Sequence, residues 1–75
     1  MFNYKNLNGN SNVESYFISD DRIVVKFFGT KELYTYSYAS AGITHVNNMK
    51  QLAIRGYGLN SYINNYCKYS YESKR

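Results

Sequence analysis

Two runs of β-branched and aromatic residues, from Arg22 to Phe28 and from Glu32 to Tyr38, lie on either side of the dipeptide Gly29-Thr30. Glycine tolerates the positive φ that a two-residue hairpin loop requires, so we expect the two runs to pair as an antiparallel hairpin. A third run, from Val13 to Ile18, precedes them across the polar turn at residues 19–21. The sequence therefore predicts a three-stranded antiparallel meander.

The register of the hairpin follows if Phe28 faces Lys31 across the loop, because opposite residues of an antiparallel pair share one face. One face then carries an apolar and aromatic set: Ile23, Val25, Phe27, Tyr34, Tyr36 and Tyr38. The other face carries Lys26, Thr35 and Ser37, with apolar side chains at Val24, Phe28 and Leu33. Only 17 of the 75 residues are Val, Ile, Leu or Phe, so tyrosine has to complete the core. We expect Tyr34 and Tyr36 to be buried, the alternative being an open platform for stacking.

The second half of the chain changes from an alternating to a helical period. Ser40 is suited to be the N-cap of a first helix, and Gly56 is placed to end it. The stripe of this helix is Ile43, Val46, Met49 or Lys50, and Ala53. A second helix of about ten residues, ending near Lys68, follows from the spacing of Leu59, Tyr62, Ile63 and Tyr66. With both helices packed on one face of the meander, the fold class is α+β, a two-layer sandwich.

Length and composition indicate one domain. Residues 1–12 contain five asparagines and no periodicity, so we expect a flexible N-terminal lead-in, a folded domain over residues 13–69 and a C-terminal tail over residues 70–75. No run resembles a signal peptide or the ~18 apolar residues of a membrane span. The single cysteine, Cys67, cannot form an internal disulfide. A cytoplasmic protein of bacterial type that does not associate with membranes is expected.

Short motifs lie along the predicted hairpin and second helix: Ile23-x-Val25-x-Phe27, Tyr34-x-Tyr36, Gly58, Asn60 and Ile63. Their order is similar to that of the KTSC domain, found in small stand-alone bacterial proteins and at the C-terminus of some lysyl-tRNA synthetases. The resemblance covers residues 11–69. It implies no established activity, and RNA binding is implied only through the association with a tRNA synthetase.

The net charge of +4 fits a nucleic-acid ligand, and we expect an accessory RNA-binding module. Phosphate contacts are assigned to Lys26, Lys50, Arg55 and Lys68, and stacking on an unpaired base to Tyr57 or Tyr69. The simpler interpretation is that these residues form an ordinary solvated surface, because they are not clustered in sequence.

The alternative function is a protein–protein interaction or structural module that self-associates through the outer sheet face around Val24, Phe28 and Leu33. Catalysis is not expected, because the acidic residues are scattered and no phosphate-binding loop is present. The only histidine, His45, has no second ligand at metal-binding spacing. We therefore expect no metal, no cofactor and no small-molecule substrate.

Overall fold

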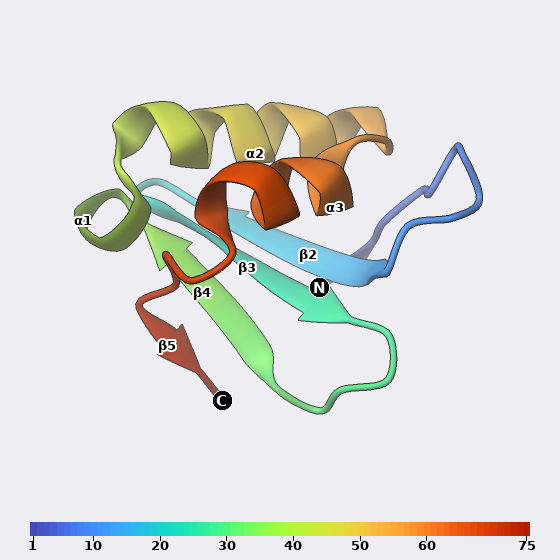
Figure 1. Cartoon of the computed structure of the whole chain (residues 1–75), viewed down its shortest axis with the longest axis horizontal. Helices are drawn as coiled ribbons and strands as arrows, with labels where there is room; N and C mark the ends of the chain where they lie inside the picture. Colours follow the sequence, from blue (N-terminus) through green and yellow to red (C-terminus); the bar gives the residue numbers. More distant parts are fainter.

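A single antiparallel sheet, with helices on one of its faces, organises the computed structural model, which describes residues 1–75 (Figure 1). Its strands, adjacent in chain order, are β1 (Phe2–Asn3), β2 (Val13–Ser19), β3 (Arg22–Phe27), β4 (Leu33–Ser37) and β5 (Ser73–Lys74). The helices are α1 (Tyr38–Ala41), α2 (Ile43–Arg55), α3 (Leu59–Tyr62) and the π-helical turn η1 (Ile63–Cys67). The predicted α+β fold with helices against an antiparallel sheet is confirmed.

The pairing of β3 with β4 has the register that the sequence predicts. Ile23 lies opposite Tyr36, and Val25 lies opposite Tyr34. Gly29 has a positive φ of 81°, as expected. Regular pairing stops at Lys26 and Leu33, however, so the connection is longer than the tight two-residue loop expected from the sequence.

The sheet has five strands, so the prediction of a three-stranded meander was incomplete. The lead-in expected to be flexible supplies β1, which pairs with β2, and the C-terminal tail supplies β5, which pairs with β4. Strands of two residues have no hydrophobic period to detect. They form because β2 and β4 would otherwise leave unpaired backbone groups at the edges of the sheet.

A bulge in β2 adjusts which side chains face the helices. Val13 lies opposite Phe27 and Ser15 lies opposite Lys26, so Glu14 is an additional residue in this strand. Val13 is fully buried as a result. The carboxylate of Glu14 accepts a hydrogen bond of 2.8 Å from Nζ of Lys26.

The first helical segment begins earlier than predicted. Ser37 is the N-cap of α1, and Ser40, expected as the cap, is the third helical residue: its backbone N–H donates to Oγ of Ser37 (3.1 Å), and its own Oγ accepts from N–H of Ser37 (3.0 Å). This capping role also buries Ser37, which was expected on the solvent side. Tyr38, predicted to end the strand, starts α1.

The helix predicted to end at Gly56 does so. Gly56 adopts a left-handed conformation with a φ of 85°, and its N–H donates to the carbonyl of Leu52 at 3.0 Å. This helix, α2, is the longest in the protein at 13 residues, and no helix has the length and apolarity required to cross a bilayer.

The predicted second helix is divided between α3 and η1. Its buried residues, Leu59, Ile63 and Cys67, recur every four residues. An α-helix with about 3.6 residues per turn would rotate such a row away from the sheet, whereas a wider π turn keeps it in line. Tyr66, placed in the predicted apolar stripe, is exposed, and Cys67 takes the buried position instead.

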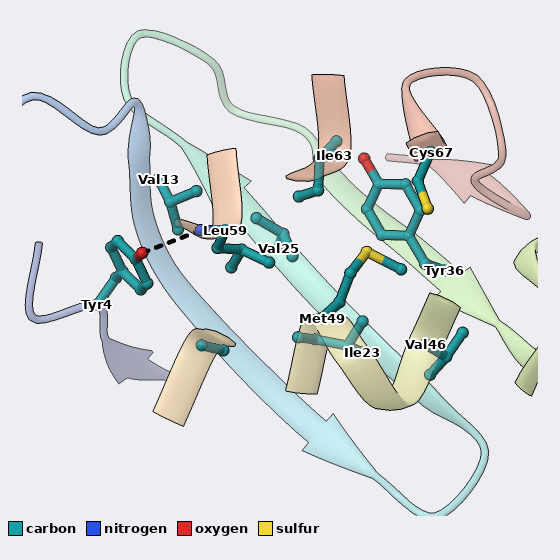
Figure 2. Packing of buried hydrophobic residues seen from close by; sticks show 11 residues of the cluster. Tyr4, Val13, Ile23, Val25, Tyr36, Val46, Met49, Leu59, Ile63 and Cys67 are labelled. Carbon is teal, nitrogen blue, oxygen red and sulfur yellow. Dashed lines mark hydrogen bonds between the residues drawn. The ribbon is translucent and has the colours of Figure 1, made fainter. Parts of the chain in front are cut away.

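The core lies between the inner sheet face and the helices (Figure 2). Its buried members are Tyr4, Val13, Ile23, Val25, Tyr36, Val46, Met49, Ala53, Leu59, Ile63 and Cys67. Tyr36 is 1% exposed, so its predicted burial is confirmed, whereas Tyr34 is only half-buried at the margin. Tyr4 belongs to the segment expected to be flexible, yet its hydroxyl accepts a hydrogen bond of 3.3 Å from N–H of Leu59.

Replacing Tyr4 tests whether the N-terminal segment is part of the folded structure. We expect Tyr4→Ala to lower the free energy of unfolding by about 2–4 kcal/mol in urea denaturation, because it removes a buried ring and leaves the amide of Leu59 unpaired. Phe2→Ala, at a side chain that is 65% exposed, is the control and should have little effect. Equal stabilities of the two variants would contradict the docking of this segment.

Candidate functional site

A pocket of about 290 Å³ lies between the inner face of the sheet and the segment formed by α3 and η1. We call it the tyrosine pocket. Its lining is Asn12, Phe27, Thr30, Tyr34, Tyr36, Asn60, Ile63, Asn64, Lys68, Tyr69, Tyr71 and Lys74. Aromatic, amide and ammonium groups from both ends of the chain are thus brought to one place.

The sheet side of the tyrosine pocket is a row of interlocked rings. Tyr34 makes edge-to-face contacts with Phe27 and with Tyr71, at centroid distances of 5.3 Å and 5.2 Å. Tyr71 also meets the ring of Tyr36 edge-on at 6.4 Å. Edge-to-face pairs favour defined ring orientations. Tyr71 reaches this row because β5, which begins two residues after it, is paired with β4.

Tyr36 brings a buried phenol to the tyrosine pocket. The hydroxyl of Tyr36 forms no hydrogen bond within the protein. Every side-chain polar atom that is sealed from solvent does have a hydrogen-bond partner. The oxygen therefore keeps some contact with solvent, and because Tyr36 lines the tyrosine pocket, we infer that it does so there. Burial raises the pKa of this phenol, so it is a neutral hydrogen-bond donor.

Two lysines supply positive charge at the tyrosine pocket. Nζ of Lys68 lies 5.7 Å from the ring centroid of Tyr69, and Lys68 forms no ion pair. Nζ of Lys74 lies 5.8 Å from the ring centroid of Tyr34 and 3.9 Å from a carboxylate oxygen of Glu32. Both lysines are exposed and able to meet an anionic group that enters the pocket.

A second, more polar hollow of about 180 Å³ lies beside the N-terminal loop, and we call it the amide pocket. It is lined by Asn6, Asn8, Asn10, Ser11, Tyr57, Gly58, Asn60 and Ser61. Tyr57 is its only aromatic residue and is 43% exposed. Asn60 also lines the tyrosine pocket, so the two hollows are neighbours.

The residues assigned to phosphate binding do not form one site. Lys68 lines the tyrosine pocket, and Arg55 is exposed in the last turn of α2. Nζ of Lys50 is 2.8 Å from the carbonyl oxygen of Asp20, to which it donates. Lys26 lies on the opposite sheet face and is paired with Glu14.

The motif residues, in contrast, gather around the two pockets. Tyr34 and Tyr36 line the tyrosine pocket, Gly58 and Tyr57 line the amide pocket, and Asn60 lines both. The sequence did not identify Asn12, Asn64, Tyr71 and Lys74 as site residues. Three of them, Asn12, Tyr71 and Lys74, lie in segments that local patterns mark as a lead-in and a tail, and only the asparagine-rich composition near the N-terminus hinted at a polar site.

The outer sheet face is not covered by any helix (Figure 1). Phe17 and Phe28 are 47% and 52% exposed there, and Val24 and Leu33 are half-buried. Its lysine, Lys26, is neutralised by an ion pair. This face is therefore apolar and has no free positive charge at its centre.

The side chains of His45 and Cys67 are engaged in contacts within the fold. Nδ1 of His45 is 2.7 Å from the hydroxyl of Tyr62, and the same hydroxyl accepts a hydrogen bond of 3.0 Å from Asn48. The ring of His45 also stacks on Tyr66. Cys67 is fully buried, and this burial raises the pKa of its thiol, which favours the unreactive protonated form.

Comparisons with protein-family models, with curated proteins and with solved structures found no match. The resemblance to the KTSC domain therefore stays a prediction from sequence motifs, and the function has to be argued from the pockets themselves.

Proposed function

We propose that this protein is an accessory RNA-binding module that holds an unpaired nucleotide in the tyrosine pocket, and that it binds without catalysing a reaction. The buried Tyr36 hydroxyl carries this proposal, because a neutral donor without a protein partner opens into the pocket. A ligand with a polar edge would satisfy it. A hydrogen bond to the ligand in place of one to water contributes about 0.5–1.5 kcal/mol, so this pairing would add to affinity.

The size and lining of the pocket support a nucleotide as that ligand. Its volume of about 290 Å³ is at the lower end of the range for small-ligand sites. The tyrosine rings match the faces of a base, and side-chain amides of Asn12, Asn60 and Asn64 match its polar edges. Lys68 and Lys74 are placed for a phosphate.

The distribution of charge favours RNA binding on the side of the molecule that carries the tyrosine pocket. Glu14 neutralises Lys26 on the outer sheet face, whereas Lys68 at the pocket is unpaired. The net charge of +4 is thus best presented to phosphates on the helix side of the molecule. The sequence resemblance to a domain that also occurs in lysyl-tRNA synthetases points to RNA as well.

The lysines of the pocket can be tested by salt-dependent binding. We expect Lys68→Gln combined with Lys74→Gln to weaken binding of a labelled single-stranded RNA about tenfold at ~50 mM salt, and to reduce the slope of log affinity against log salt by about 0.7 per lost contact. Fluorescence anisotropy measures both. Lys26→Gln, which removes one positive charge from the outer face, should leave binding unchanged. Equal losses in the two proteins, or no binding by wild type at micromolar concentration, would contradict the proposal.

Removing the hydroxyl of Tyr36 tests the observation on which the proposal rests. Tyr36→Phe should leave the free energy of unfolding nearly unchanged, because the hydroxyl has no partner in the protein, but should weaken RNA binding about threefold to tenfold. Tyr38→Phe is the matched control, because its hydroxyl donates to Asn47 at 2.9 Å outside the pocket. Urea denaturation and anisotropy together give the result. An unchanged affinity in Tyr36→Phe would show that this hydroxyl does not meet the ligand.

A second candidate function, self-association through the outer sheet face, is favoured by Phe17 and Phe28, which expose about half of their surface beside Val24 and Leu33. The patch is also suited to meet its own copy. In a two-fold dimer one surface faces itself, and a surface that pairs its charges internally, as Lys26 and Glu14 do, avoids like-charge repulsion.

Sedimentation of a charged variant tests this second candidate. If the outer face is an interface, Phe28→Asp should shift a dimer to monomer in analytical ultracentrifugation while circular dichroism stays unchanged. Ile54→Asp is the control, because Ile54 is equally exposed, at 55%, on α2. A wild-type protein that remains monomeric at ~100 μM would eliminate this candidate at any affinity tighter than that concentration.

A further inference from the structure

The two pockets form neighbouring parts of one surface. Asn60 lines both of them. On the other side, the N-terminal loop contributes Asn10 and Ser11 to the amide pocket and the next residue, Asn12, to the tyrosine pocket. A ligand that fills one pocket can therefore continue into the other without leaving contact with the protein.

The loop that forms the amide pocket is fixed by its own hydrogen bonds. Oδ1 of Asn6 accepts from N–H of Ser11 at 3.0 Å, and Oγ of Ser11 accepts from N–H of Val13 at 3.1 Å. N–H of Leu7 donates to the carbonyl of Gly56 at 2.8 Å, which ties the loop to the end of α2. A wall built before the ligand arrives reduces the entropy cost of binding.

The chemistry of the amide pocket differs from that of its neighbour. It has one aromatic side chain, Tyr57, and otherwise amides, hydroxyls and a glycine, with no charged group. An aromatic ring with surrounding amides is suited to a base and to a ribose hydroxyl, whereas the phosphate-binding lysines belong to the tyrosine pocket alone.

We infer that the tyrosine pocket and the amide pocket together bind two consecutive nucleotides of a single RNA strand, with the second base stacked on Tyr57. The inference rests on the proposed function and specifies its ligand. Asn60, between the pockets, contacts both nucleotides.

Short adenylates with a 5′-phosphate distinguish binding of one nucleotide in the tyrosine pocket from binding of a second nucleotide in the amide pocket. Calorimetric titration with AMP, pApA and a dinucleotide whose second position is abasic measures the contribution of the second base. Adenine is chosen because asparagine amides pair well with its donor and acceptor edge. We expect pApA to bind about tenfold more tightly than AMP and the abasic dinucleotide to lose most of that gain, since stacking of one base contributes this order of affinity.

Two protein variants complete the design. Tyr57→Ala should remove the advantage of pApA and leave AMP binding unchanged, whereas Lys68→Gln with Lys74→Gln should weaken both ligands. Binding of AMP with no advantage for pApA, or an advantage that survives Tyr57→Ala, would overturn the two-nucleotide inference and leave the proposed function standing. Failure of wild type to bind either AMP or pApA would overturn the nucleotide pocket itself.

Discussion

The antiparallel pairing of β3 with β4 is the interaction on which the rest of the structure depends. It places Ile23, Val25 and Tyr36 together on the face that the helices cover. It also gives β4 a free edge, to which β5 adds. The chain is short of aliphatic residues, so this face is completed by tyrosine. One consequence is that the core contains the phenol of Tyr36, which lines the tyrosine pocket and is able to donate to a polar ligand there.

Local sequence patterns determine some elements of this fold, and contacts between distant segments determine others. The hairpin register was predictable because alternation over six residues is a local pattern, and Gly56 was predictable as a helix end because its position demands a left-handed conformation. β1 and β5 were not predictable, because two-residue strands depend on edges built elsewhere in the chain. The choice of Ser37 over Ser40 as the cap depends on where β4 ends.

Local sequence patterns identify some residues of the candidate site, and the others depend on segments that are distant in the chain. Asn60 and Lys68 lie on a helical segment that its periodicity reveals, so they could be named in advance. Tyr71 and Lys74 reach the pocket only through the pairing of β5, and Asn12 only through the docked N-terminal loop. A positive charge that looked evenly spread in sequence is divided by the fold. An ion pair with Glu14 neutralises Lys26 on the outer sheet face, whereas Lys68 on the helix side has no acidic partner.

The central claim is that an unpaired nucleotide occupies the tyrosine pocket. A nitrogen–proton NMR correlation spectrum, recorded during titration with single-stranded RNA, tests it most directly because side-chain amides report on their own surroundings. We expect the side-chain signals of Asn12, Asn60 and Asn64 to shift together and saturably, with the backbone amides of Val24 and Thr35, which report on the outer sheet face, unchanged. Shifts confined to the outer sheet face, or no shifts at all, would contradict it.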